Sequence, residues 1–514
     1  MIFNIINASM RTSQGPNILL ITSDQQHWMT MGYNNPEIQT PNLDRLAARG
    51  MIFDRAYCPN PTCTPTRASI LTGQYPSQHG AHTLGTKLDE KVPTMNDAWH
   101  DAGYQSALVG KAHFQPLQST EEYPSLESYP ILQDLEFWKS YDGPFYGFDR
   151  FELARNHTDE AHAGQHYAIW MEEKGFKDWR KCFQAPTGTG GRQYGAWNIP
   201  EEYHYNTWIS ERTNAILEDY AQSETPFFLW SSYFDPHPPY TVPEPWASMY
   251  DPDSLDLPTG REGEHEKNTI FHKITQMENP DLAAYGLGDG KWMHGVQSHL
   301  RSESRKRKDM AIYYGMVSCM DHYIGKTLDK LDELGLTENT LVVFTTDHGH
   351  YFGQHGLIAK GPYHYEDGVK VPMIAAWPGH IPEGTRTEAL QSLVDLPVSF
   401  LAAAGIEKPQ RMTGLDQSPV WAGQKDKVRD WCIVENNHEP GICEHKTYVE
   451  ADYKLTVFRT FDDGELYDLK NDPGEFENRF NDPAYADIKI RLLQRFLQAE
   501  MAKEVLSMPR IAPA

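Results

Sequence analysis

The chain has 514 residues, enough for one large domain with a smaller companion. Hydrophobic residues make up 39% of it, a proportion that indicates a soluble globular protein. A formal net charge of −25 argues against nucleic acid or an anionic membrane surface as a partner, because the summed field repels both. An anionic substrate would therefore need a locally basic pocket.

Four short apolar runs between residues 17 and 346 alternate with helical patterns. This arrangement is typical of an α/β sheet covered by helices. We predict buried strands at 17–23, 106–110, 226–233 and 340–346. Each strand is followed by ionisable residues, namely Asp24, Lys111 to His113, Asp235 to His237, and Asp347 with His348. Ligands of open α/β sheets gather at the carboxyl ends of strands, so these four ends predict one convergent site.

Three further regions complete the predicted organisation. Residues 114–200 are rich in aromatics, Gly and Pro and are interpreted as an insertion over the strand ends. The basic run 305–308 opens a predicted long helix. After Gly423, short strands at 431–434, 446–450 and 454–458 and a helix at 485–505 predict a small antiparallel α+β domain. We therefore divide the chain into a catalytic α/β domain, 1–424, and a C-terminal domain, 425–514.

Six cysteines, at positions 58, 63, 182, 319, 432 and 443, are sparse and irregularly spaced. This pattern fits reduced thiols better than a disulfide framework, although Cys58 and Cys63 are close enough to pair. The first ten residues lack the basic and apolar regions of a secretion signal, and no run approaches a membrane span. We expect a cytoplasmic protein that does not act at a membrane.

A thiol stands directly before a predicted helix in the stretch that begins with Cys63. Thr64 is suited to cap this helix and Pro65 to occupy its first position, where a missing N–H costs nothing. The free backbone N–H groups of such a helix start favour an anion. A buried structural cysteine before a helix is the alternative interpretation.

The Cys-x-Pro-x-Arg motif at 63–67, continued by Leu-Thr-Gly at 71–73, resembles the signature of the type I sulfatases. The cysteine of that family is converted after synthesis to formylglycine, an aldehyde. Asp24-Gln25 upstream and Asp347-His348-Gly349 downstream repeat the family's order, and the resemblance runs from residue 17 to 478. It implies an alkaline phosphatase-like α/β fold with a large mixed central sheet flanked by helices, and a formylglycine-generating enzyme as a maturation partner.

The resemblance also implies one divalent cation, held by Asp24, Gln25, Asp347 and His348 together with residue 63. Family members usually show two adjacent aspartates where this chain has Asp24-Gln25. The glutamine is similar to that of the phosphonate monoester hydrolase and choline sulfatase branches. Calcium is the first choice because oxygen donors dominate the set, and manganese is the alternative because His348 is a softer ligand.

The remaining catalytic roles are implied by the same resemblance. Lys111 and Lys360 match lysines that hold the sulfate group, and Arg67 would fix the attacking hydroxyl of formylglycine. His237 matches the histidine that protonates the leaving alcohol. His113 matches the base that deprotonates the second hydroxyl, so that sulfate departs by elimination.

The leading hypothesis is a sulfuric ester hydrolase that acts on a small anionic sulfate ester. A phosphonate monoester or phosphodiester hydrolase on the same scaffold is the rival, and Lys111 with His113 favours the sulfate monoester. A non-catalytic binding protein is a third interpretation. The sequence also leaves open whether the protein forms a homo-oligomer. We interpret His157, His162 and His166 as surface histidines rather than a zinc site, and the run 187–191 as a loop that lacks the lysine of a phosphate-binding motif.

Overall fold

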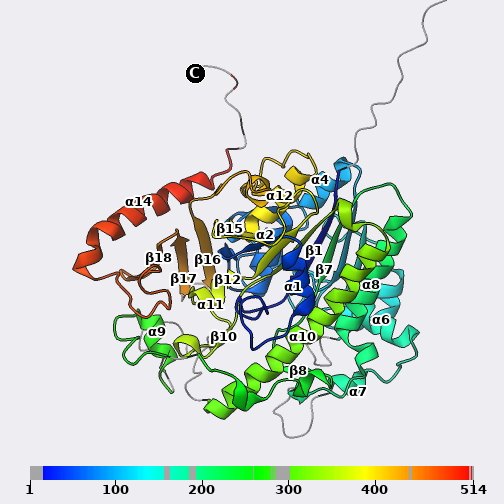
Figure 1. Cartoon of the computed structure of the whole chain (residues 1–514), viewed down its shortest axis with the longest axis horizontal. Helices are drawn as coiled ribbons and strands as arrows, with labels where there is room; N and C mark the ends of the chain where they lie inside the picture. The colour runs from blue at the N-terminus through cyan, green and yellow to red at the C-terminus, as the bar shows by residue number, and fades with distance from the viewer. Residues whose placement is uncertain are drawn as a thin grey trace, which may run out of the picture.

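A computed structural model describes residues 15–155, 163–184, 193–258, 260–278, 280–281, 283, 301–438, 443–506, 508 and 511. Its centre is an eight-stranded mixed sheet (Figure 1). The strand order is β14 (Thr385–Thr387), β2 (Met51–Phe53), β13 (Met373–Ala376), β9 (Thr340–Thr346), β1 (Asn17–Ser23), β7 (Phe227–Ser232), β4 (Gln105–Gly110) and β5 (Arg150–Leu153). Strands β9, β1, β7, β4 and β5 run parallel, and β13 is antiparallel to both of its neighbours. The predicted mixed α/β sheet is confirmed.

Helices cover both faces of this sheet because alternate side chains of its strands are buried in two different cores. Leu19 and Ile21 of β1 belong to one core, and Ile18 and Leu20 belong to the other. The first core includes α1 (Pro41–Ala48), α6 (Gln165–Glu173), α8 (Tyr205–Ala221) and α10 (Glu303–Glu333). The second includes α2 (Cys63–Thr72), α4 (Met95–Asp101) and α12 (Leu396–Ala403).

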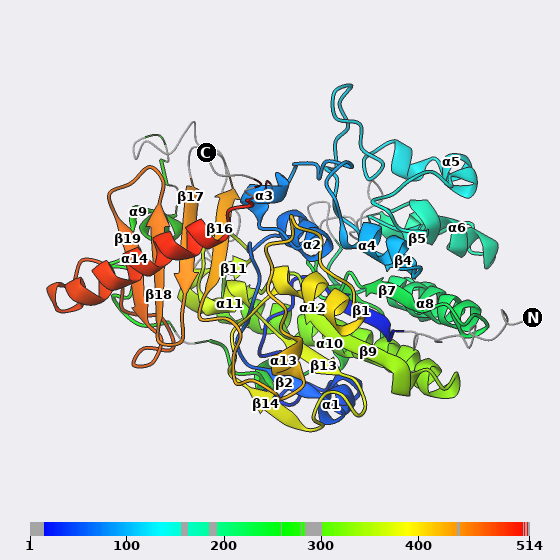
Figure 2. The ribbon, with the colours of Figure 1, turned by 90° about the horizontal axis from the view of Figure 1, so that it is seen from above.

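A second, four-stranded antiparallel sheet follows in the chain. Its order is β16 (Cys432–His438), β17 (Cys443–Val449), β18 (Tyr453–Phe458) and β19 (Gly464–Asp468). Helix α14 (Ala486–Ala502) packs on it through Leu492 and Phe496. Figure 2 shows this sheet and α14 at one side of the molecule, beside the central sheet. The expected antiparallel α+β unit is confirmed, with β19 as an additional strand.

The segment 114–200 is more than an insertion over the strand ends. It contributes β5, which pairs in parallel with β4 and forms one edge of the central sheet. It also contains α5 (Leu135–Ser140) and α7 (Arg180–Phe183) besides α6. The run 187–191 lies outside the described residues, as do His157 and His162.

His166, on α6, is half-buried, so its interpretation as a surface histidine is wrong. Its Nδ1 accepts a hydrogen bond from the Leu153 backbone N–H at 3.0 Å, and its ring meets Trp138 edge-on. Burial lowers the pKa of His166 to about 4. Each of the six cysteines lies within the described residues and is buried and free, so Cys58 and Cys63 do not pair.

Short elements connect these layers. They are β3 (Ala56–Tyr57), α3 (Pro76–His79), β6 (Gly195–Ala196), β8 (Thr241–Val242), α9 (Ile270–Thr275), β10 (Tyr351–Phe352), β11 (Ile358–Ala359), α11 (Glu366–Val369), β12 (Lys370–Val371), β15 (Gln391–Ser392) and α13 (Ser418–Trp421). Among the described helices, none combines the length and apolar character needed to cross a lipid bilayer.

Candidate active site

Side chains that follow four neighbouring parallel strands meet at one edge of the central sheet. Asp24 follows β1, Lys111 follows β4, and Asp347 follows β9, while His237 lies in the loop after β7. The strands are adjacent in the order β9-β1-β7-β4, so their carboxyl ends lie side by side. The expected convergence of these strand ends is confirmed.

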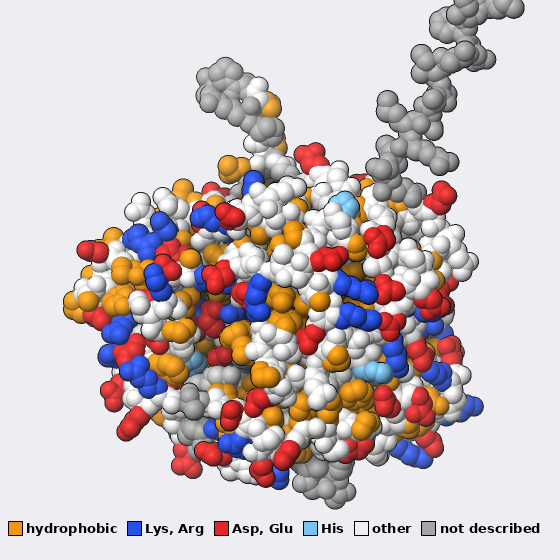
Figure 3. Space-filling view, in the orientation of Figure 1, with side chains coloured by type: hydrophobic (Ala, Val, Ile, Leu, Met, Phe, Trp, Pro, Cys, Tyr) orange, Lys and Arg blue, Asp and Glu red, His pale blue; other side chains and the backbone are white. Residues whose placement is uncertain are grey.

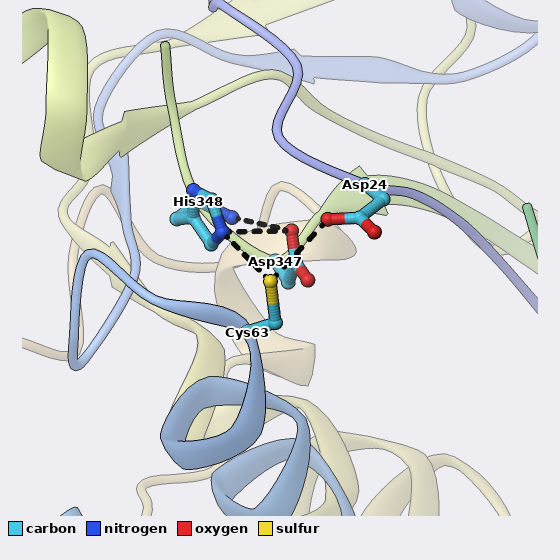
Figure 4. A group of neighbouring side chains, drawn as sticks. All are labelled: Asp24, Cys63, Asp347 and His348. Atoms are coloured by element: carbon cyan, nitrogen blue, oxygen red, sulfur yellow. Dashed lines mark hydrogen bonds and ion pairs between the residues drawn. The ribbon is translucent and has the colours of Figure 1, made fainter. Parts of the chain in front are cut away.

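Cys63 enters this edge from the first turn of α2. The helix starts at Cys63 itself, so the expected cap at Thr64 is wrong. Thr62 occupies the cap position, but its N–H and hydroxyl both bond to the Asn60 side chain, at 2.8 and 2.5 Å. The helix begins two residues earlier than expected, with Pro65 in its third position, and the Cys63 thiol projects from the helix start toward the strand ends (Figure 4).

The Cys63 sulfur lies among two cations, an imidazole and a carboxylate. Its Sγ is 3.2 Å from His348 Nε2, 3.2 Å from Lys360 Nζ, 3.5 Å from Asp24 Oδ1 and 3.9 Å from Lys111 Nζ. Burial and the Asp24 carboxylate raise the pKa of the Cys63 thiol, but Lys111 and Lys360 outweigh them and bring it below its ordinary value. The pocket therefore favours negative charge at position 63.

Donor atoms of Asp24, Cys63, Asp347 and His348 lie within 4.8 Å of one another, and all four residues are buried (Figure 4). The Gln25 backbone N–H donates to Asp347 Oδ1 at 2.9 Å, which brings the fifth predicted ligand residue to the same place. Gln25 Oε1 is buried and has no hydrogen-bond partner among the described residues. A buried amide oxygen without a hydrogen-bond partner among the described residues, on the residue whose backbone contacts Asp347, fits a ligand of a divalent cation.

Arg67 links α2 to three strand ends. Its Nε donates to Asp347 Oδ2 at 2.8 Å, and its Nη1 donates to the Lys111 carbonyl at 3.0 Å and to Ser232 Oγ at 2.8 Å. Both members of the Arg67–Asp347 ion pair are fully buried. Lys111 Nζ in turn contacts Asp24 Oδ2. Arg67 therefore holds a carboxylate of the cluster in place rather than facing solvent.

His237 and Lys360 form a hydrogen-bonded pair. Lys360 Nζ lies 2.9 Å from His237 Nε2, and His237 Nδ1 lies 2.5 Å from the Pro238 carbonyl. Because a carbonyl only accepts, Nδ1 carries the proton and Nε2 accepts from Lys360. Burial, Lys360 and Lys111 hold the pKa of His237 well below its usual value. The His237 imidazole is therefore neutral here, and Lys360 is the hydrogen-bond donor of the pair.

His113 is held at the margin of the cluster by two residues of the 114–200 segment. Its backbone N–H donates to Glu127 Oε2 at 2.9 Å, and Arg155 Nη2 lies 2.6 Å from its Nε2. Arg155 also pairs with Glu127 at 3.0 Å, and burial lowers the pKa of its guanidinium against an opposing effect of that carboxylate. Arg155 and Glu127 therefore hold His113 in position.

A family model described as Sulfatase matches residues 16–406. The chain belongs to the sulfatase family. A second model, described as N-sulphoglucosamine sulphohydrolase, C-terminal, matches residues 353–502. The family resemblance drawn from the motifs is confirmed, and this sulfatase is an enzyme of sulfate ester hydrolysis.

Its relatives cover nearly the whole chain. An uncharacterized sulfatase, YidJ, of Escherichia coli K12 is 27% identical over 93% of this chain and 85% of the relative. An arylsulfatase of Clostridium perfringens is 26% identical over 95% and 94%. Among solved structures, the phosphonate monoester hydrolase SpPMH of Silicibacter pomeroyi is similar, with a TM-score of 0.78 and 25% identity over 97% of this chain and 98% of that one.

Sequence reasoning missed three residues of the sulfatase site. Ser232 is the last residue of β7, yet a serine at a strand end carries no signal of its own. Arg155 follows β5 by two residues, so its position at a strand end would have been informative if β5 had been predicted. Glu127 has no such marker, because only the folded chain brings its carboxylate to the His113 backbone.

Proposed function

We propose that this sulfatase hydrolyses a small sulfate monoester with residue 63, converted to formylglycine, as its nucleophile. One divalent cation would be held by Asp24, Gln25, Asp347 and His348, with calcium as first choice and manganese as the alternative. The observation that carries the proposal is the meeting of Cys63 with Lys111, Lys360 and this donor set in one buried cluster. Maturation would require a formylglycine-generating enzyme as partner.

A hydrated formylglycine supplies one hydroxyl for attack on sulfur and a second whose deprotonation releases sulfate, while a cation supplies positive charge to the sulfate oxygens. Lys111 and Lys360 add two ammonium groups that face residue 63. In a buried site such charges act strongly on the anionic oxygens of the substrate, because little water screens them. Lys111 and Lys360 thus form the locally basic pocket that an anionic substrate requires in a protein with a net negative charge.

The Lys360–His237 pair would protonate the leaving alcohol. Lys360 holds the proton and His237 Nε2 accepts from it, so loss of the proton to the alcohol leaves a neutral amine hydrogen-bonded to a neutral imidazole. His113 would serve as the base for sulfate release. Its Nε2 accepts a hydrogen bond from Arg155, and this bond must break before Nε2 takes up the proton.

A phosphonate monoester hydrolase is the second candidate. The similarity to SpPMH favours it, and so does the glutamine at position 25. Lys111 and His113 favour the sulfate monoester, since they place an ammonium and an imidazole where phosphonate enzymes of this family carry uncharged residues. A non-catalytic binding protein is the weakest candidate, because every expected site residue is present.

The first test is the chemical state of residue 63 and the substrate preference. Mass spectrometry of the tryptic peptide that contains position 63 should detect formylglycine, and purified enzyme should turn over an aryl sulfate faster than a phosphonate monoester. Cys63→Ala should abolish turnover with an unchanged unfolding midpoint, because only the nucleophile is lost. Cys58→Ala, a buried cysteine outside the donor cluster, is the control and should retain both formylglycine and activity.

Substantial turnover by Cys63→Ala would contradict the formylglycine mechanism. A wild-type enzyme that prefers phosphonate monoesters by a wide margin in kcat/KM would support the second candidate instead.

A further inference from the structure

Gln25 is the one amide side chain among the predicted cation ligands, and its nitrogen contacts a histidine outside that set. Gln25 Nε2 lies 2.9 Å from His350 Nδ1, and His350 Nε2 lies 3.1 Å from the Tyr240 hydroxyl. All three residues are buried. The His350 ring also packs between Tyr313 and Phe352, with centroid distances of 4.6 and 4.7 Å. The ring is therefore fixed in position.

The direction of these hydrogen bonds follows from the donor and acceptor groups. An amide NH2 can only donate, so His350 Nδ1 accepts from Gln25 and the ring proton resides on Nε2. That proton is then donated to the oxygen of Tyr240, which closes the chain of contacts. The two ends of the Gln25 amide are thereby distinguished, with nitrogen toward His350 and oxygen on the opposite side.

The oxygen end is the end that a cation requires. Gln25 Oε1 is buried without a hydrogen-bond partner among the described residues, while the backbone N–H of the same residue donates to Asp347. The reversed amide would aim two N–H donors at the cation and remove a ligand. A carboxylate at position 25 would have no such problem, because its two oxygens are equivalent.

We propose that His350 is a positioning residue that sets the amide orientation in which Gln25 presents Oε1 to the cation. The proposal rests on the proposed function, because it requires a cation at the Asp24, Asp347 and His348 cluster. It accounts for a glutamine at a position where a carboxylate is the simpler ligand. Outer partners of metal ligands of this kind contribute to metal affinity by holding the ligand in its binding orientation.

The experiment measures calcium affinity of the chelator-treated, full-length protein by titration calorimetry, a readout that does not involve turnover. His350→Leu removes the acceptor and should weaken calcium binding by about 10–100-fold. His350→Gln can again accept from Gln25 and should recover part of the loss. His364→Leu is the matched control, a buried histidine whose Nδ1 contacts Thr447 at 2.7 Å, and should leave calcium affinity unchanged.

Repeating His350→Leu in a Gln25→Glu variant distinguishes a loss of amide orientation from a general disturbance of the site. In Gln25→Glu, either oxygen can face the cation, so adding His350→Leu should weaken calcium binding far less than it does beside Gln25. Equal losses in the two backgrounds would overturn the proposal. If His350→Leu does not fold, Tyr240→Phe removes the acceptor of the ring proton and should weaken binding several-fold, and an unchanged affinity would overturn the proposal as well.

Asp347→Ala distinguishes this inference from the cation site on which it rests. That variant should lose most calcium binding, because it removes a carboxylate of the cluster. If it binds calcium as tightly as the wild type, the proposed cation site is wrong. If it loses binding while His350→Leu does not, only the role of His350 is overturned.

Discussion

Single residues in the active site are arranged so that buried charges compensate one another. Asp24 and Asp347 are opposed by Lys111 and Arg67, and burial of all four groups makes each unpaired charge costly. Lys111, Arg67, Lys360 and His348 together outweigh the effect of burial and hold the pKa of Asp24 well below its usual value. The cluster therefore keeps the Asp24 carboxylate ionised and still offers cations to an anionic substrate, within a chain whose net charge is −25.

Lys111→Ala and His113→Ala should each reduce kcat/KM for an aryl sulfate by at least about a hundredfold, the magnitude typical of a removed acid/base or charge-stabilising group. Initial rates over a range of substrate concentrations measure this loss. Lys139→Ala, on the exposed face of α5, is the control and should behave as the wild type. Undiminished sulfate ester turnover in both site variants would show that neither residue serves this reaction.

The short helix α3 is hydrogen-bonded to helix α2 through the side chain of His79. His79, the last residue of α3, accepts a hydrogen bond at Nδ1 from the Ala81 backbone N–H at 3.2 Å, and its Nε2 lies 3.0 Å from Ser69 Oγ of α2. Burial lowers the pKa of His79 to about 4, against an opposing effect of the Glu435 carboxylate. The neutral ring is the form that makes both contacts, so α2 is held best when His79 is unprotonated.

This arrangement predicts an acid-dependent loss of stability with a defined sign. The pKa of His79 in the folded protein, about 4, lies below its unfolded value of about 6.5, so its contribution is complete above about pH 6.5 and is lost as the pH falls toward 4. Between about pH 7.5 and 5, the free energy of unfolding should fall by about 2 kcal/mol more in the wild type than in His79→Gln. Denaturant unfolding at both pH values measures the difference.

The exposed His100, replaced by Gln, is the control and should leave the pH dependence as in the wild type. Equal slopes for the wild type and His79→Gln would contradict the assigned role of His79.

Buried ion pairs connect the region of the central sheet to the region of the C-terminal sheet. Lys454 of β18 is buried and contacts Glu366 of α11 at 3.3 Å, and it also pairs with Glu475. Buried Arg429, which precedes β16, likewise pairs with Asp395, which precedes α12. On the outer surface, by contrast, Lys and Arg are interspersed with Asp and Glu over the face shown in Figure 3. Exposed pairs of that kind contribute little, so the buried ones matter most for docking the second sheet.

Lys454→Met should destabilise the protein by about 3–5 kcal/mol, because it leaves Glu366 and Glu475 without their buried cation. The midpoint of denaturant unfolding checks this expectation. Lys427→Met is the control, since Lys427 is 67% exposed in its pair with Asp430 and should change stability little. A midpoint for Lys454→Met within the range of the control would refute a role of this contact in joining the sheets.

Features that depend on neighbours along the chain could be predicted from the amino-acid sequence. The runs 17–23 and 340–346 are strands with the predicted bounds, because a continuous apolar run between polar residues suits a strand buried on both faces. The Cys63 motif and the ionisable residues after the strands are likewise local features of the sequence. They were enough to indicate the family. The boundary at 424 stays a prediction.

Contacts between residues far apart in the chain became visible in the folded protein alone. The order of the strands places Arg155 beside His113 and His350 beside Gln25, and neither pair has any local signal. The start of α2 also lies two residues before the expected one, where the Asn60 side chain engages the cap residue Thr62. Hydrogen bonds between residues hundreds of positions apart depend on how the sheet is assembled, and a sequence pattern records only what lies within a few turns of the chain.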